Sequence, residues 1–156
     1  MLGPAELPAL LRDWEDRLGR LTGMDVGLRL AEPRLSIEAW SVGGVRGCDE
    51  RAAWWGLTRH HAIVLGAGLL MFPDRVLREH LASSEDNELV QDAFGEVANL
   101  AFATVHQHLR EARGAGVRVW KHDQRLFARA PDAPIVASCE LRLPGHPVGE
   151  LRLHAA

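Results

Sequence analysis

Hydrophobic residues recur at helical spacing in three parts of this chain. The longest of them, residues 86–113, contains no proline and is rich in alanine, leucine, glutamate, glutamine and arginine, which favour helices. Gly114 follows it, where a helix is expected to end. Residues 5–21 show the same spacing, as do residues 74–81 after Pro73, a residue that suits the start of a helix. We predict a helix over each of these three segments.

Shorter segments alternate apolar and polar residues with a period of two, as strands with one buried face do. Residues 62–72 are instead continuously apolar and contain two glycines, and we interpret them as one central strand or two short ones. The glycine-rich segment 41–49 is interpreted as a loop or hairpin end. The remaining predicted strands are residues 25–30, 35–40, 54–57, 117–121, 135–143 and 148–153, of which the last two form a terminal hairpin.

These elements together predict an α+β protein. Its sheet is expected to be mostly antiparallel, with about six strands and two helices packed on one side, plus an N-terminal helix. The length of 156 residues suits a single domain, 1–156, in which the helix within residues 1–23 is the one candidate appendage.

Composition narrows the class of protein further. The chain is 47% hydrophobic and 25% charged, as expected for a globular protein with a sizeable core. Its net charge of -3 gives no indication of a nucleic-acid or anionic-membrane partner. No apolar run reaches transmembrane length, and the N-terminus shows no signal-peptide pattern. Because Cys48 and Cys139 form neither a disulfide framework nor a metal spacing, we expect a reduced, cytoplasmic protein.

The predicted helix over residues 86–113 has two unlike sides. Its broad apolar side consists of Leu89, Val90, Ala93, Phe94, Val97, Ala98, Leu100, Ala101 and Val105. A narrow polar stripe lies opposite, within roughly 60° of arc, and consists of Asp92, Glu96, Asn99, Ala103 and Arg110. Long side chains are missing from its middle, and Ala103 leaves a gap beside Asn99. Such a surface would let another protein approach closely, whereas a face that only meets water needs no such gap.

Three residues of the stripe form the pattern D-x3-E-x2-N, namely Asp92, Glu96 and Asn99. Spacings of four and then three residues keep the three side chains on one helical face. The plain alternative is a solvated helix face, since charged helix faces usually serve only to meet water.

Around this pattern the sequence resembles the CheC/CheX/FliY phosphatases of bacterial chemotaxis. The chain reads Asp92-AFG-Glu96-VA-Asn99-LAF-Ala103, similar to the family's signature helix, with Ala103 where the family usually has glycine. An apolar, glycine-containing segment and a short helix precede the signature, and a terminal hairpin follows it, so the resemblance covers about residues 62–156. The single copy of the motif is similar to the CheX type, which implies a homodimer.

The resemblance implies a phosphatase that hydrolyses the aspartyl phosphate of a CheY-like receiver domain. Asn99 would orient the attacking water, and Glu96 would dock on the active-site lysine of the receiver. Asp92, Ala103 and His106 would contribute to the docking surface. The protein would need no cofactor or metal of its own, because Mg²⁺ would arrive with the receiver.

Two departures from the family pattern leave a second interpretation open. Members often carry a proline about 22 residues after the asparagine, a place that falls here near Lys121 and His122, and glycine is usual where this chain has Ala103. The alternative is a catalytically silent module of the same fold that binds a receiver or another signalling partner. A structural scaffold with a coincidental motif is a third possibility.

Other candidate chemistry is weaker. His106 and His108 are two residues apart on a helix and point to different sides, and His60 and His61 are adjacent in a predicted turn, so no metal site is predicted. Trp54-Trp55 is expected to pack in the core or in a dimer seam. Cys139 is interpreted as a small buried strand residue.

Overall fold

The computed structural model describes residues 3–46, 51–85, 87–114, 116, 118–126 and 129–155. These residues form four helices and six strands. In chain order they are α1 (Leu7–Thr22), β1 (Gly27–Leu30), β2 (Ala39–Arg46), β3 (Arg51–Leu57), α2 (Arg59–Leu69), α3 (Asp74–Ala82), α4 (Glu88–Arg113), β4 (Arg118–Leu126), β5 (Ile135–Arg142) and β6 (Gly149–Ala155).

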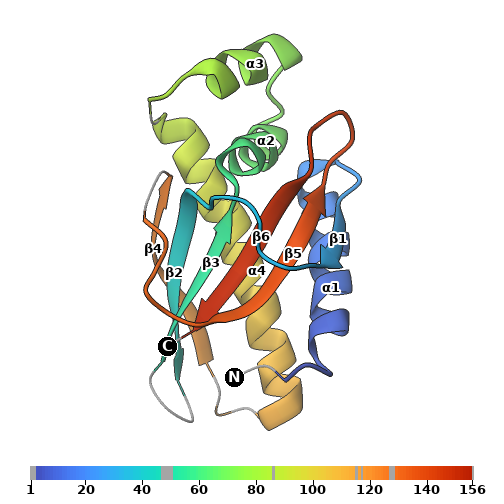
Figure 1. Cartoon of the computed structure of the whole chain (residues 1–156), viewed down its shortest axis with the longest axis vertical. Helices are drawn as coiled ribbons and strands as arrows, with labels where there is room; N and C mark the ends of the chain where they lie inside the picture. Colours follow the sequence, from blue (N-terminus) through green and yellow to red (C-terminus); the bar gives the residue numbers. More distant parts are fainter. Residues whose placement is uncertain are drawn as a thin grey trace.

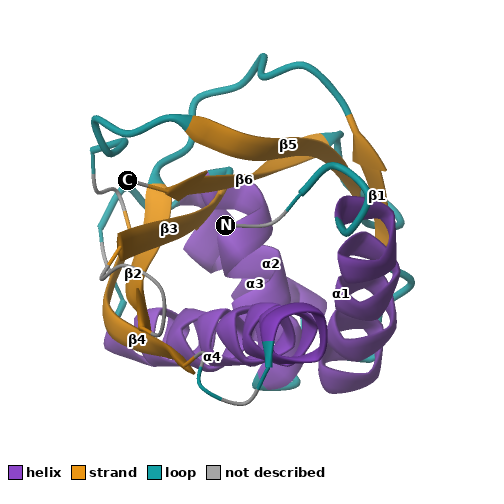
Figure 2. Ribbon diagram, turned by 90° about the horizontal axis from the view of Figure 1, so that it is seen from below, coloured by secondary structure: helices purple, strands orange, loops and turns teal. Residues whose placement is uncertain are grey.

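The six strands form one antiparallel sheet with the order β1-β5-β6-β3-β2-β4. The central strands β3 and β6 are far apart in the sequence, and their pairing sets Leu57 opposite Leu151. The four helices lie on one side of this curved sheet, and α4 runs across it behind the strands (Figures 1 and 2). The segment between β1 and β2 crosses the opposite, outer face of β5 and β6 (Figure 1). The predicted α+β class, with about six mostly antiparallel strands, is confirmed.

The main core lies between the sheet and the helices. Trp55 on β3 is buried between α1 and α4, where its ring meets the edge of Trp14 and stacks on Phe94 with centroids 6.0 Å apart. The indole nitrogen of Trp14 also donates to the backbone oxygen of Ala101 on α4, at 3.0 Å. The N-terminal helix is thus part of the same core as α4, and Trp55 packs there as the sequence predicts for Trp54-Trp55.

The prediction of a strand over residues 62–72 is wrong, because most of this segment belongs to helix α2. Helix α2 is buried on nearly every side from His61 to Ala67, so its sequence from Ala62 onward is apolar and shows no helical period. Gly66 lets the helix lie close to α4, since a side chain there would approach the backbone oxygen of Val90 at 3.3 Å. The two helices predicted for one side of the sheet therefore become three, α2, α3 and α4, beside α1.

The segment 35–49 is also arranged differently from the prediction. The predicted strand 35–40 begins only at Ala39, and the predicted loop at 41–49 is strand β2 as far as Arg46, while residues 47–50 lie outside the described part of the chain. Glycines in β2 pair normally with β3 and β4, and the ladder shifts register between Val42 and Gly43. Here the sheet on both sides overrides the local preference of glycine for loops.

The ends of α4 follow the local sequence closely. Asn87 caps the first turn, because its side-chain oxygen accepts from the backbone nitrogens of Leu89 at 3.0 Å and Val90 at 3.3 Å. At the other end Gly114 has a φ of 97°, a conformation that side-chain-bearing residues rarely adopt. The predicted helix is confirmed, and its first residue is Glu88.

Candidate functional site

The polar stripe predicted from the sequence lies on the exposed side of α4. Asp92, Glu96, Asn99 and Ala103 are all exposed, and His106 is half-buried. Between them, Ala93, Phe94, Val97, Ala98 and Ala101 are buried against the core. The structure therefore brings the predicted site residues together on the side of α4 that is not buried against the core.

Helix α4, which carries the stripe, is packed against α1 and α2. On one flank α1 contacts α4 through Trp14 and through Asp13, whose carboxylate lies 2.6 Å from the Nε2 atom of His108. On another side α2 approaches the α4 backbone at Gly66. Because the buried side of α4 is packed along its length, the exposed side chains project from a backbone that has little freedom to move.

The three motif side chains are available to a partner. Within the described residues, no hydrogen bond or ion pair engages the side chains of Asp92, Glu96 or Asn99. Two carboxylates and one amide therefore face solvent within two helical turns. Carboxylates at such a place attract a cationic group, and the neutral amide can donate and accept hydrogen bonds without repelling an anion.

One residue of the predicted apolar side behaves differently. Leu89 is 59% exposed, so its assignment to the buried side of the helix is wrong. It belongs to the first turn of α4, where Val90, the next residue, faces the core. The spacing contained a signal for this outcome, because seven residues separate Leu89 from Glu96 and place the two side chains within about 20° of each other.

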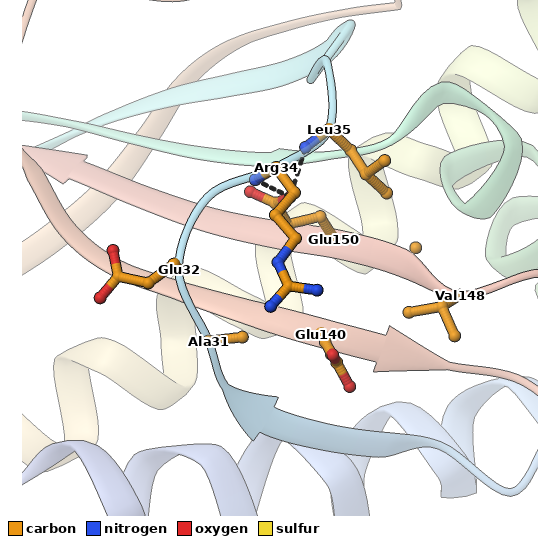
Figure 3. A pocket seen from close by; sticks show the side chains of 8 residues that line it. Ala31, Glu32, Arg34, Leu35, Glu140, Val148 and Glu150 are labelled. Atoms are coloured by element: carbon orange, nitrogen blue, oxygen red, sulfur yellow. Dashed lines mark hydrogen bonds between the residues drawn. The ribbon is translucent and has the colours of Figure 1, made fainter.

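A second candidate site is a hollow of about 270 Å³ on the outer face of the sheet (Figure 3). It lies under the segment between β1 and β2 and is lined by Arg34, Leu35, Glu140, Val148 and Glu150, among others. Two further hollows lie beside α1 and beside the ends of β1 and β5, and none of these three includes a residue of the stripe. This hollow can bind a polar ligand only if the polar groups that line it are free to form hydrogen bonds.

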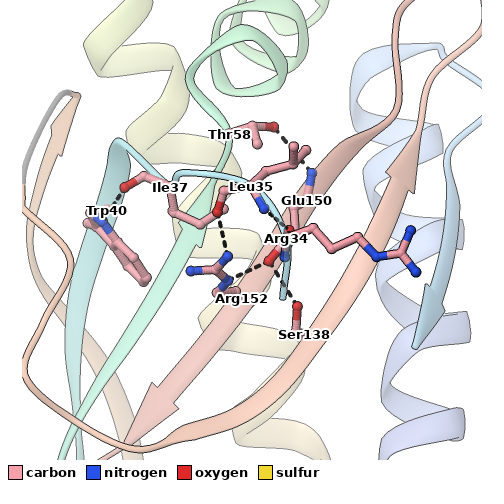
Figure 4. A network of polar contacts seen from close by, with 8 residues as sticks. All are labelled: Arg34, Leu35, Ile37, Trp40, Thr58, Ser138, Glu150 and Arg152. Carbon is pink, nitrogen blue, oxygen red and sulfur yellow. Dashed lines mark hydrogen bonds and ion pairs between the residues drawn. The ribbon is translucent and has the colours of Figure 1, made fainter. Parts of the chain in front are cut away.

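The buried carboxylate of Glu150 is already fully engaged (Figure 4). It accepts from the backbone nitrogens of Arg34 at 3.0 Å and Leu35 at 2.8 Å, from the Ser138 hydroxyl at 3.0 Å, and from the Arg152 guanidinium. Burial by itself would raise the pKa of Glu150, but these hydrogen bonds outweigh it and hold the pKa below its usual value. This network ties the crossing segment to the sheet, and we assign it a structural role.

Three histidines meet where α2 begins beside the β5–β6 hairpin. The Nε2 atom of His60 lies 3.0 Å from Nδ1 of His146, and the Nε2 atom of His61 lies 2.7 Å from the backbone oxygen of Pro147. Burial lowers the pKa of His61 to about 4, although the hydrogen bond to Pro147 opposes this shift. Both nitrogens of His61 are thus occupied, the second by the Thr58 hydroxyl at 2.8 Å. Among the described residues, no group of three or more His, Cys, Asp or Glu side chains could hold a metal ion.

The cysteines provide no further reactive site among the described residues. Cys139 is a free, buried thiol, and burial raises its pKa to about 12, so it is a poor nucleophile. Cys48 lies outside the described residues. Of the helices described, none is both long enough and apolar enough to span a membrane.

The fold is shared with solved structures of several named proteins. The chain matches FliY from Thermotoga maritima with a TM-score of 0.69 at 15% identity, over 98% of this chain and 90% of that one. It matches the FliM middle domain from H. pylori with a TM-score of 0.71 at 8% identity, over 98% and 92%. It matches the chemotaxis protein CheX from Desulfovibrio desulfuricans with a TM-score of 0.59 at 14% identity, over 97% and 99%. No protein-family model matches the sequence, and no curated protein matches it significantly.

These likenesses confirm the fold that the resemblance to the CheC/CheX/FliY proteins implies. At identities of 15% or lower they are evidence about architecture. The FliM middle domain, which lies outside that resemblance, has the same fold, and so the fold by itself does not choose between activities. The choice depends on the side chains of the stripe and their chemistry.

Proposed function

We propose that this protein accelerates hydrolysis of the aspartyl phosphate on a CheY-like receiver domain. The observation that supports the proposal most strongly is the pairing of Glu96 and Asn99, which lie exposed, one turn apart, on a helix whose other side is buried. The motif's resemblance to the chemotaxis phosphatases and the shared fold with CheX support the same conclusion.

Hydrolysis of an aspartyl phosphate proceeds by in-line attack of water, and a protein assists mainly by positioning that water. The amide of Asn99 suits this role, because its oxygen can accept from the water while its nitrogen donates to a phosphoryl oxygen. Being neutral, it does not repel the phosphoryl group as an aspartate would. The residue would act from outside, completing the active site of the partner.

Glu96 supplies the docking interaction in this proposal. An exposed carboxylate one turn from Asn99 can pair with a lysine in the receiver's active site and so set the register of the two surfaces. Ala103, one turn further along, keeps the surface low enough for the partner to approach Asn99. Asp92 and His106 would contact the edge of the same partner surface. Mg²⁺ would be bound by the receiver.

The proposal predicts distinct defects in two variants. Receivers loaded with acetyl phosphate are mixed with the protein, and loss of phosphate is followed over time. We expect Asn99→Ala to lower the rate by about a hundredfold, as removal of one positioned polar group typically does. We expect Glu96→Lys to raise the receiver concentration needed for half-maximal rate by about tenfold, because it replaces attraction by repulsion.

Glu111→Lys is the matched control, because it reverses an exposed charge on α4 outside the stripe. All variants should unfold within about 0.5 kcal/mol of the wild type, since the substituted side chains are exposed. Wild-type protein that leaves the phosphate lifetime of every receiver unchanged would contradict the proposal.

A binding module without catalysis is the second candidate function. The match to the FliM middle domain favours it, since this fold also occurs outside the CheC/CheX/FliY resemblance. Ala103, in place of the usual glycine, also favours it. This candidate predicts that wild-type protein binds a phosphorylated receiver, measured by calorimetry with a non-hydrolysable phosphoryl mimic, and that the phosphate lifetime does not change.

A further inference from the structure

Leu89 is the one large apolar side chain that the described part of α4 leaves mostly exposed. Leu100, at nearly the same angle around the helix, packs partly against the core, whereas Leu89 is 59% exposed. Its backbone is held by the Asn87 cap, and Val90 beside it is buried, so its outward direction is set by the helix itself. An exposed leucine at a rigid position contributes to an interface more readily than one on a loose segment, because less freedom is lost on binding.

Leu89 lies in line with the stripe. Seven residues place it within about 20° of Glu96 around the helix and about 10 Å from it along the axis. The two residues therefore belong to one continuous surface on α4. A partner that covers Glu96 and Asn99 and is as large as a receiver domain would also cover Leu89.

The charges around Leu89 indicate what kind of surface meets it. Glu85, Glu88, Asp92 and Glu96 are all exposed around or near this end of α4. A second copy of this chain that met Leu89 about a twofold axis would set these carboxylates against their own copies, which is unfavourable. A partner with an apolar patch beside basic groups is complementary.

We propose that Leu89 is the apolar anchor with which this protein holds a phosphorylated receiver domain. The inference rests on the proposed function and adds to it a partner-binding residue outside the motif. About 10 Å separate Leu89 from Glu96, and Asn99 is further still, so Leu89 contacts the receiver away from the phosphoryl group. It should therefore contribute to binding of the receiver and leave the chemical step alone.

The test separates binding from turnover. Steady-state dephosphorylation is measured with the acetyl-phosphate-loaded receiver that the wild type dephosphorylates fastest. We expect Leu89→Ser to raise KM about fivefold with kcat unchanged. The receiver would bury roughly half of the leucine side chain's surface, and serine would lose that apolar contact. Leu89→Met should restore most of the affinity. Leu35→Ser is the matched control, because Leu35 is 41% exposed but lies on the segment that crosses the opposite face of the sheet.

Each result has a definite meaning. Equal KM values for Leu89→Ser and Leu35→Ser in an active protein would overturn the anchor and leave the proposed function standing. A fall in kcat at constant KM would also overturn it. A change in sedimentation of the unmixed Leu89→Ser variant would assign the leucine to a contact between copies instead. A wild type inactive on every receiver would overturn both proposals together.

Discussion

The side chain at position 99 shows how much one residue type decides. The exposed amide of Asn99 contributes little to the stability of α4, because asparagine is a modest helix former. In the proposed function this amide positions the attacking water, and its place on α4 is fixed by the buried neighbours Val97 and Ala98. A residue that does not favour the helix in which it stands is recognisable from the sequence as a candidate functional residue.

Met71 is a second residue whose local conformation is costly. It has a φ of 55° after the end of α2, in the left-handed region that favours glycine, and it is 87% exposed. We expect Met71→Gly to stabilise the protein by about 0.5–1 kcal/mol, because relief of the backbone exceeds the added freedom of the unfolded chain. Chemical denaturation measures the difference. Met71→Ala, which keeps the side-chain carbon responsible for the strain, should give little or no gain, and an equal gain in both variants would contradict this explanation.

At the scale of elements, α4 and α2 illustrate opposite kinds of predictability. Helix α4 is amphipathic and ends at Gly114, and both features are visible within a few residues of sequence, whereas its cap at Asn87 is seen in the structure. Helix α2 is buried almost completely, so its apolar run carries no period that would distinguish it from a strand. Its close packing against α4 at Gly66 is visible only in the structure.

The start of α2 also carries a pH dependence. His61 is buried there, and its pKa of about 4 in the folded protein lies below the ordinary histidine value of 6.5. Its neutral form stabilises the fold fully above pH 6.5, and this stability is lost as the pH falls from 6.5 through 4, because the unfolded chain binds the proton more readily. We expect the free energy of unfolding to fall by on the order of 2 kcal/mol across this range.

Urea unfolding at several pH values measures this slope. His61→Gln should flatten it, although the variant is less stable at every pH because the ring fills the space beside Gly149. His60→Gln is the comparison variant, since the pKa of His60 is also lowered, by burial and by its neighbours His146 and Arg59. A slope that persists in full in the His61 variant would assign the pH dependence to other groups.

At the scale of the whole molecule, a polar network fastens the outer face of the sheet. Glu150 on β6 joins the segment before β2 to β5 through Arg34, Leu35 and Ser138 (Figure 4). Under the same segment Trp40 covers Gly56, where a side chain would come within 2.5 Å of its ring. The helices cover one face of the sheet, and this segment covers part of the other.

Removal of the buried charge should weaken the whole fold. We expect Glu150→Gln to cost about 2–4 kcal/mol, because donors that now meet a carboxylate would meet an amide group and Arg152 would lose its buried partner. Thermal unfolding followed by circular dichroism measures the loss. Glu140→Gln is the control on the same face, where the partners Arg29 and Arg142 are largely exposed and little change is expected. Similar losses in both variants would contradict a special role for Glu150.

The sequence by itself determined the features that depend on neighbours a few residues apart. These are helix α4 with its end at Gly114, the exposed line of Asp92, Glu96, Asn99 and Ala103, and the terminal hairpin of β5 and β6, because periodicity and turn chemistry act over short distances. The tertiary structure alone decided the helical state of α2, the strand order and the engagement of Glu150. Each of these depends on which distant segments come to cover a residue, and burial by a distant segment leaves no pattern in the residues beside it.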